Sequence, residues 1–224
     1  MKRGHRYLKN WGFAMDDRIY CYEGSDVLIN KLGIHDAGTL AAAERKLTGL
    51  RLLELMRQPV QGDFDLQHLC CIHRHIFQDL YAWAGSLRDV DIAKGTLFCK
   101  AEYLDAESAR IFNALGRERT SGRMPPETAV KTCAYYFSEI NALHPFREGN
   151  GRAQREFIRE LALTEGYIIE FYRVTEEEML YASRESFLWQ LRADGTAVPQ
   201  MPQSCHWITI ADIDVKHWVW FKDQ

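Results

Sequence analysis

Apolar residues recur along most of the chain with the three- and four-residue spacing of helices that bury one face. Pro145 must end one of these helices, because the residue before a proline is disfavoured in helical geometry. Gly166 is placed to end the next one. The spacing predicts helices over residues 39–57, 66–80, 101–115 and 127–143, one opening near Gly151, and one beginning at Thr175.

Polar residues suited to capping precede two of these helices. Thr39 is expected to cap the first helix and Asp65 the second. His73 lies on the apolar stripe of the second helix, where a hydrogen-bonded core histidine is the preferred interpretation. The first helix is expected to bury one face formed by Leu40, Ala43, Leu47, Leu50 and Leu53.

Two stretches depart from the helical spacing. In residues 87–97, Val90 and Ile92 alternate with charged residues, and Lys94-Gly95 is a turn signal, so a short hairpin is expected there. Residues 193–224 hold prolines and tryptophans and end in a segment that could form a terminal strand or hairpin. The chain is therefore expected to be one mainly α domain with a small β-hairpin flap.

Composition and charge narrow the class of protein. The 224 residues are 46% hydrophobic and 26% charged, which is typical of a globular domain. The net charge of −3 and the lack of a basic stripe speak against a nucleic-acid partner. No apolar run is long enough to span a membrane, and the start lacks the apolar stretch of a signal peptide. A cytoplasmic protein is expected, and its six cysteines, without a CxxC pair, are read as reduced thiols.

One short segment, residues 144–155 with the sequence HPFREGNGRAQR, carries candidate chemistry. Gly149 and Gly151 permit a tight turn that directs several backbone N–H groups toward one point at the start of a helix, where phosphate binds well. Arg152 and Arg155 are three residues apart, so both leave the same helical face near that point. Two guanidinium groups there suit a di- or triphosphate.

The same segment offers a metal ligand and a base. The Glu148 carboxylate is a hard oxygen ligand next to the expected phosphates, as in sites where protein and nucleotide hold Mg²⁺ jointly. His144, fixed in a turn by Pro145, is placed to accept a proton from a hydroxyl near neutral pH. Any one of these residues alone suits ordinary turn chemistry. Together they supply every part that a phosphoryl-group transfer needs.

The segment also resembles the signature of the Fic family, His-Pro-Phe-x-Asp/Glu-Gly-Asn-Gly-Arg-x-x-Arg, at every specified position. HRHIFQDLYAWAGSLRDVDIAKGTLFC resembles the region that leads into the flap of Fic proteins, and the likeness covers roughly residues 22–186. The resemblance implies a Fic-type helical bundle with three parts: an N-terminal arm (1–21), the Fic domain (22–192) and a C-terminal tail of unknown role (193–224).

The resemblance also assigns roles to residues. It implies that His144 is the general base, that Glu148 binds Mg²⁺, and that Pro145 and Phe146 anchor the loop. It implies an anion hole at Gly149, Asn150 and Gly151, with Arg152 and Arg155 on the outer phosphates of ATP. The flap that lays the target protein alongside as an added strand is then formed by Lys94, Gly95, Thr96, Leu97, Phe98 and Cys99.

The reaction implied is transfer of AMP from ATP to a Tyr, Thr or Ser hydroxyl of a target protein. The alternatives are a Fic-fold transferase with another donor or with ATP reversed, as in Doc-type kinases, and a non-catalytic nucleotide-binding module. Many Fic proteins carry an inhibitory helix with the pattern Ser/Thr-x-x-x-Glu-Gly/Asn. No Ser or Thr of this chain has Glu four residues later. We therefore expect a separate, small, antitoxin-like protein as a second partner.

Overall fold

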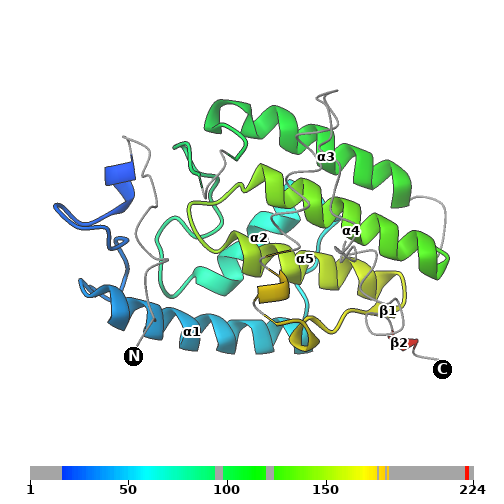
Figure 1. The fold of residues 1–224 in the computed structure, drawn as a ribbon, viewed down its shortest axis with the longest axis horizontal. Coiled ribbons are helices and arrows are strands. Elements are labelled where there is room, and N and C mark those ends of the chain that lie inside the picture. The colour runs from blue at the N-terminus through cyan, green and yellow to red at the C-terminus, as the bar shows by residue number, and fades with distance from the viewer. Residues whose placement is uncertain are drawn as a thin grey trace, which may run out of the picture.

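The computed structural model describes residues 17–93, 98–119, 124–175, 177–179, 181 and 220–221. The fold is mainly helical, as the apolar spacing predicted (Figure 1). Its α-helices are α1 (Ala37–Arg57), α2 (Leu66–Phe77), α3 (Leu104–Glu118), α4 (Pro126–Leu143) and α5 (Asn150–Thr164). Short 3-10 turns are η1 (Asp17–Tyr20), η2 (Ala101–Tyr103) and η4 (Phe171–Arg173), and the strands are β1 (Tyr167–Ile168) and β2 (Trp220–Phe221).

The helices are arranged around α2 and α5, which pack against each other at the centre. Helix α1 packs on α2 along one edge of the molecule, and α3 packs on α4 along the opposite edge (Figure 1). Helix α4 also packs on α5. The loop between α4 and α5 therefore joins two packed helices of the core, and the second of them contacts α2.

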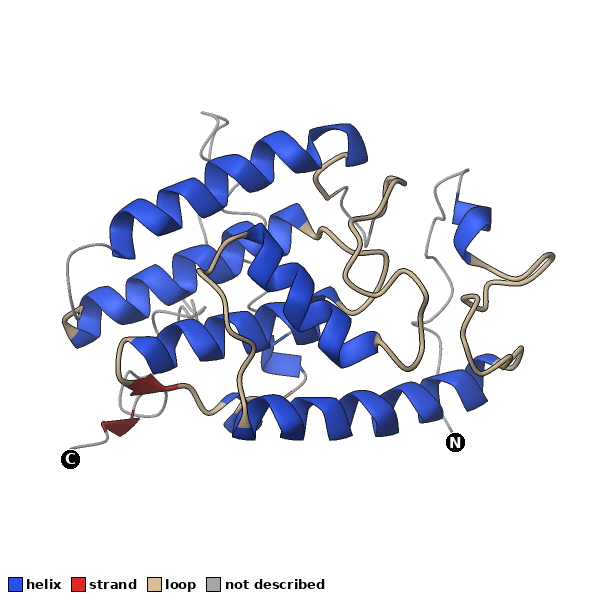
Figure 2. Cartoon of the chain, turned by 180° about the vertical axis from the view of Figure 1, so that it is seen from behind, coloured by secondary structure: helices blue, strands red, loops and turns tan. Residues whose placement is uncertain are grey.

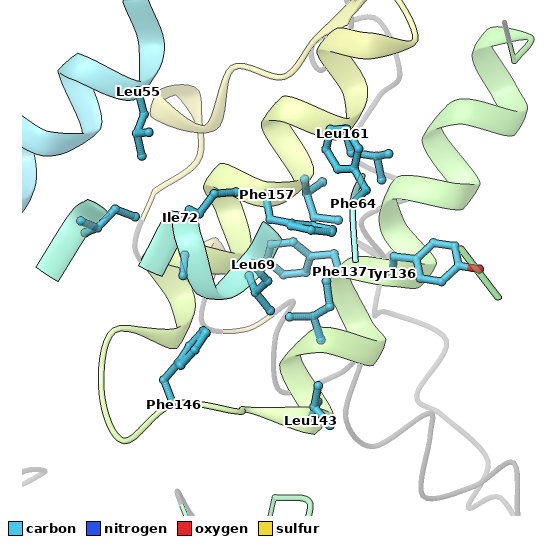
Figure 3. Packing of buried hydrophobic residues seen from close by; sticks show 14 of the residues in the cluster. Leu55, Phe64, Leu69, Ile72, Tyr136, Phe137, Leu143, Phe146, Phe157 and Leu161 are labelled. Carbon is cyan, nitrogen blue, oxygen red and sulfur yellow. The ribbon is translucent and has the colours of Figure 1, made fainter. Parts of the chain in front are cut away.

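The core between these helices is rich in aromatic rings. Phe157 of α5 is fully buried and makes an edge-to-face contact with Phe64 at 5.4 Å between ring centroids (Figure 3). It makes another with Phe112 at 5.7 Å. Edge-to-face pairs of this kind add about 0.5–1.5 kcal/mol beyond the area they bury. These contacts pack the middle of α5 against α3 and against the segment that precedes α2.

The prediction for the first helix was wrong in two respects. The cap is Asp36, whose carboxylate accepts a hydrogen bond from the N–H of Thr39, so the helix begins before Thr39. Leu50 and Leu53 are 53% and 54% exposed, whereas Leu55 is fully buried. The inward face of α1 instead includes polar residues that bond to other elements, and apolar spacing cannot detect such a face.

The other helices form where the sequence predicted them, but two have shifted ends. Helix α2 ends at Phe77 and not at residue 80, and α3 runs over Leu104–Glu118 and not over 101–115, because residues 101–103 form the 3-10 turn η2. Asp65 caps α2 by accepting from the N–H of His68, and Gly166, with φ 83°, follows the end of α5. Thr175 and Glu178 exchange the hydrogen bonds of a capping box, which supports a helix start at the predicted place. Most of that predicted helix, residues 176, 180 and 182–191, lies outside the described residues.

The described strands lie at the end of α5 (Figure 2). Tyr167 pairs with Phe221 and Ile168 with Trp220 in an antiparallel register, so part of the predicted terminal strand docks on β1, which itself packs against α5. The turn of the predicted flap, residues 94–97, lies outside the described residues. In the described part of the chain, no helix has the length and apolar character needed to cross a membrane.

Candidate active site

The segment with candidate chemistry is the loop that joins α4 to α5 and the first turn of α5. His144 directly follows α4 with left-handed backbone angles, φ 47° and ψ 60°. A non-glycine residue in that region is strained and persists only where its surroundings hold it. Gly149 precedes α5 with φ 81°, and a Cβ atom added there would lie 2.2 Å from Cζ of Phe77. The loop therefore packs so closely on α2 that only glycine fits.

The Asn150 side chain closes the loop from the inside. Its Oδ1 accepts from the N–H of Phe146 at 2.8 Å, and its Nδ2 donates to the carbonyl oxygen of Phe146 at 2.7 Å. Phe146 is 1% exposed and points from the loop toward α2 (Figure 3). Its ring stacks on that of His73, with centroids 3.8 Å apart. Asn150 thus shapes the loop with its side chain, and only its backbone N–H is left for an anion.

The imidazole of His144 is held in one tautomer. Its Nδ1 lies 3.2 Å from the carbonyl oxygen of Asn141, a contact that requires a hydrogen on Nδ1. Nε2 then carries the lone pair of the neutral ring. The ring of Phe98, from the predicted flap, stacks on the imidazole with centroids 3.7 Å apart and an angle of 13° between the planes. Both contacts together fix the orientation of the ring.

Backbone N–H groups gather where α5 begins. The N–H of Gly149 donates to Oε1 of Glu148 at 2.9 Å. Within the described residues, the N–H groups of Asn150 and Gly151 have no acceptor. They belong to the first turn of the helix, where the N–H groups have no partner within the helix and the helix dipole is positive. This arrangement favours a negatively charged group at the start of α5.

Arg155 lies beside these donors and is partly buried. A Cβ atom added to Gly151 would lie 3.2 Å from Nη1 of Arg155, which places the guanidinium over the first turn of α5. It makes no hydrogen bond or ion pair with a residue in the described part of the chain. Burial lowers the pKa of Arg155, and the positive charge of Arg152 lowers it further. A multiply charged anion would compensate this guanidinium well.

Arg152, in contrast, is bonded within the protein. Its Nη2 forms an ion pair with Oε1 of Glu44 at 2.5 Å, and its Nη1 donates to Oγ1 of Thr48 at 3.2 Å. The other carboxylate oxygen of Glu44 accepts a hydrogen bond from the Tyr81 hydroxyl. The sequence assigned Arg152 and Arg155 alike to the outer phosphates, but the two side chains differ in their surroundings. The sequence did not identify Glu44 as a site residue.

Arg88 is a second residue that sequence reasoning missed. It is 3% exposed, and no carboxylate pairs with it among the residues that the structure describes. Its guanidinium donates to the carbonyl oxygens of Val90 at 2.7 Å and His144 at 2.9 Å, and also to that of Cys99. Burial lowers the pKa of Arg88. Its neighbours in the sequence do not reveal this position, because the partners come from three separate segments.

The structure describes the flap only on either side of its turn. Lys94, Gly95, Thr96 and Leu97 lie outside the described residues. The N–H of Phe98 donates to the carbonyl oxygen of Ile92 at 3.3 Å, and that of Cys99 donates to the carbonyl oxygen of Ala142 at 3.0 Å. Phe98 and Cys99, which follow the turn of the flap, therefore lie against the end of α4, next to His144.

A protein-only metal site is not found in the described part of the chain, where no three His, Cys, Asp or Glu side chains form a cluster suited to a metal ion. Glu148 offers one carboxylate at the start of α5. Mg²⁺ is commonly held by one or two carboxylates together with substrate phosphates and water. The residues present therefore fit a metal ion that is shared with a nucleotide.

Comparison with known proteins agrees with this geometry. The chain is 40% identical over 176 residues to a Salmonella typhimurium protein named probable protein adenylyltransferase Fic, covering 78% of this chain and 86% of that protein. It is also 40% identical to protein adenylyltransferase VbhT of Bartonella schoenbuchensis, over 74% of this chain and 37% of VbhT. The crystal structure of an N-terminal Fic domain from Bartonella quintana with bound ADP superposes with a TM-score of 0.72 at 28% identity, over 77% of this chain and 88% of that one.

The family model described as Fic/DOC matches residues 63–162, which span the chain from α2 through the loop to most of α5. The similarity to the Salmonella relative covers 176 residues, more than the family model matches. This chain belongs to the Fic/DOC family.

Proposed function

We propose that this chain is a protein adenylyltransferase, which moves AMP from ATP onto a Tyr, Thr or Ser hydroxyl of a target protein. The observation that carries the proposal is the pairing of two features at the start of α5. One is the Arg155 guanidinium, which lies beside helix N–H groups and lacks a partner in the described part of the chain. The other is His144, a base whose tautomer is set by Asn141. Relatives of this chain are named for the same activity.

His144 acts as the general base in this proposal. Nε2 takes the proton of the target hydroxyl, and the hydroxyl oxygen attacks the α-phosphorus of ATP. The bond from that phosphorus to the oxygen bridging the α- and β-phosphates breaks, and pyrophosphate leaves. The Nδ1–H···O=C bond to Asn141 stabilises the ring as it gains its second proton.

Binding of the phosphates is assigned to the start of α5. The N–H groups of Asn150 and Gly151 and the guanidinium of Arg155 converge there. Arg152 is assigned to the same phosphates, but Glu44 and Thr48 already bind its guanidinium, so Arg155 is the main ligand. The developing negative charge is stabilised by groups that are in place before the reaction.

Glu148 is the residue that would hold Mg²⁺, which supplies charge neutralisation on the phosphates when bound. Because Glu148 is the one carboxylate assigned to the metal, Glu148→Gln should raise the Mg²⁺ concentration needed for half-maximal transfer. Glu118→Gln, in the last turn of α3, is the control. An unchanged Mg²⁺ requirement in Glu148→Gln would remove the residue from this role.

The target protein is assigned to the flap formed by residues 94–99. The described residues of the flap support this assignment, because Phe98 stacks on His144 and the N–H of Cys99 is hydrogen-bonded to the end of α4. A strand that adds to the flap by backbone hydrogen bonds would lie beside the base whatever its side chains. Such docking places a hydroxyl near Nε2 of His144 without a specific recognition pocket.

Labelled ATP tests the reaction against its alternatives. The protein, Mg²⁺ and ATP are incubated with a cell extract, with the label on either the α- or the γ-phosphate. Transfer of the α label to protein is the expected result. Transfer of only the γ label would mean that ATP binds reversed, and ATP binding without any transfer would indicate a non-catalytic module.

Regulation by a separate small helical protein completes the proposal. A carboxylate at the Arg155 guanidinium would occupy the place of the outer phosphates and block ATP. The sequence lacks the inhibitory pattern that would supply one: Thr39 is followed by Ala43 four residues later, and Glu44 comes one place too late. Glu44 in fact pairs with Arg152. An antitoxin-like partner that inserts a glutamate beside Arg155, in the cytoplasm where ATP is available, is the inhibitor we propose.

A further inference from the structure

His73 is a fully buried histidine on α2 that lies directly behind the loop between α4 and α5. Its ring stacks on Phe146 at 3.8 Å and on Phe77 at 4.7 Å between centroids. Its two ring nitrogens contact backbone groups of two different segments, Gly85 and Glu148. A side chain that only filled the core would not need both polar contacts.

The two contacts determine where the ring carries its hydrogen. The N–H of Gly85 donates to Nδ1 of His73 at 2.9 Å, so Nδ1 is an acceptor. The neutral ring then has its hydrogen on Nε2, which donates to the carbonyl oxygen of Glu148 at 2.9 Å. The ring is neutral in this arrangement, because Nδ1 accepts a hydrogen bond and so carries no hydrogen. A second proton would face the Gly85 N–H and break that bond.

The bond to Glu148 controls the orientation of one peptide group. In a planar trans peptide, the carbonyl and the N–H point in opposite directions. Because the Glu148 carbonyl points to His73 on α2, the N–H of Gly149 points to the other side. There it donates to Oε1 of Glu148 at 2.9 Å.

This orientation needs a constraint from outside the loop. Gly149 has φ 81°, and glycine tolerates positive and negative φ about equally, so the peptide before it can flip at little cost. A flip would turn the N–H of Gly149 toward α2 and the carbonyl oxygen toward the start of α5. A carbonyl oxygen there would repel phosphate. Two hydrogen bonds oppose this flip: the bond from the Gly149 N–H to Oε1 of Glu148 lies within the loop, and the bond from His73 Nε2–H to the Glu148 carbonyl comes from α2.

We propose that His73 is a positioning residue, which fixes the Glu148–Gly149 peptide so that the N–H of Gly149 faces the phosphates of the nucleotide. The proposal rests on the function proposed above for the start of α5. In the structure this N–H donates to Oε1 of Glu148, so it can serve a phosphate only once that carboxylate releases it. The proposal explains, from a residue on a different helix, how the Gly149 member of the implied anion hole is oriented.

Two variants separate the hydrogen bonds of His73 from its ring. His73→Gln retains an acceptor for Gly85 and a donor for Glu148 but loses the stack on Phe146. His73→Phe retains the stack and loses both hydrogen bonds. The control is His68→Phe on the same helix, because His68 is 3% exposed and contacts Val60 and Glu160 far from the loop.

The measurements are ATP affinity by calorimetry, transfer of α-phosphate label to protein in a cell extract, and the thermal midpoint of each variant. Removing one donor of an anion hole lowers turnover about 10²–10³-fold in known enzymes. We expect His73→Phe to lose at least about 10-fold in kcat with a smaller change in the KM for ATP, since His73 acts through one of several donors. We expect His73→Gln to recover most of that loss, and His68→Phe to keep its transfer rate per folded molecule.

Transfer by His73→Phe at the wild-type rate would overturn the proposal. Equal losses in His73→Phe and His73→Gln would also overturn it, because the ring and not its hydrogen bonds would then matter. If neither variant folds, the ¹⁵N chemical shifts of His73 in the wild-type protein decide: hydrogen on Nε2 supports the proposal and hydrogen on Nδ1 overturns it. A wild-type protein that folds and shows the Nε2–H tautomer but transfers no α label would refute the proposed function and leave this assignment standing.

Discussion

Nε of Arg88 donates a hydrogen bond of 2.9 Å to the backbone carbonyl oxygen of His144, across 56 positions of the sequence. His144 has φ 47°, a strained conformation for a residue with a side chain. The same guanidinium binds carbonyl oxygens of Val90 and Cys99, on either side of the flap. One buried cation therefore links the expected base to the expected docking strand.

Replacement of Arg88 should separate these two parts of the site. Arg88→Met removes all the donors of the guanidinium, and bonds to charged groups contribute about 1.5–3 kcal/mol each. We expect protein modification to fall at least about 10-fold, the equivalent of one such bond, while ATP binding at the start of α5 persists. Label transfer and calorimetry measure the two effects. Arg110→Met, on the exposed face of α3, is the control, and an Arg88→Met protein with normal transfer would exclude the link.

The assignment of His144 as the base predicts a loss of chemistry without a loss of binding. His144→Ala should lower the transfer rate by about 10²–10⁴-fold, the usual contribution of a general base. ATP affinity should stay near that of the wild type, because the phosphates are assigned to α5. His75→Ala on α2 serves as the matched histidine control. Turnover close to wild type in His144→Ala would rule out this residue as the base.

The sequence predicted the parts of the fold that local patterns control. Apolar spacing and Pro145 placed the loop between α4 and α5, and the run from His144 to Arg155 fell at that loop. The face of α1 was predicted wrongly because its inward positions include Thr48, which is 2% exposed and bonds to Arg152. Local spacing gives no sign of a polar residue that is buried by a partner far along the chain.

The same limit explains the supporting residues of the site. Glu44 lies 108 positions from Arg152 and His73 lies 75 positions from Glu148. His73 was predicted as a hydrogen-bonded core histidine, which the structure confirms, but its partners could not be named. Arg88 has no local signal at all, because each of its acceptors is a backbone carbonyl, which every residue has.

The lack of a described partner for Arg155 predicts a selective effect on triphosphates. Arg155→Ala should weaken ATP binding by about 10-fold or more, since a charged hydrogen bond is worth about 1.5–3 kcal/mol. AMP binding should change much less, because Arg155 is assigned to the outer phosphates. Calorimetry with both nucleotides tests this. Arg159→Ala, one turn further along α5 and paired with Glu156, is the control. Equal losses for ATP and AMP would contradict the assignment.

Strand addition at the flap makes a prediction that depends on the backbone alone. Leu97→Pro removes an N–H donor, whereas Leu97→Ala keeps it and changes only the side chain. We expect Leu97→Pro to block modification of target proteins in an extract and to leave ATP binding intact, with Leu97→Ala close to the wild type. If Leu97→Pro still modifies its targets normally, the substrate does not dock by backbone pairing at this position.

The final prediction concerns the cell in which the chain is made. The described residues place no carboxylate on Arg155, and the sequence holds no Ser or Thr with Glu four residues later, so neither observation indicates an internal inhibitor. Expression of this chain alone in bacteria should therefore arrest growth, and His144→Ala should abolish the arrest at equal protein levels. Co-expression of the small glutamate-bearing partner should restore growth in proportion to its binding.

A competing source of inhibition is the chain itself, through residues 193–224. Of these, Trp220 and Phe221 are described, and they pair with β1 beyond the far end of α5, whereas Arg155 lies over the first turn of that helix. This separation argues that the described part of the tail does not cover the phosphate site. Deletion of residues 193–224 should thus leave growth arrest unchanged. A harmless, inactive wild-type protein that becomes active only after this deletion would show that the tail, and not a separate partner, is the inhibitor.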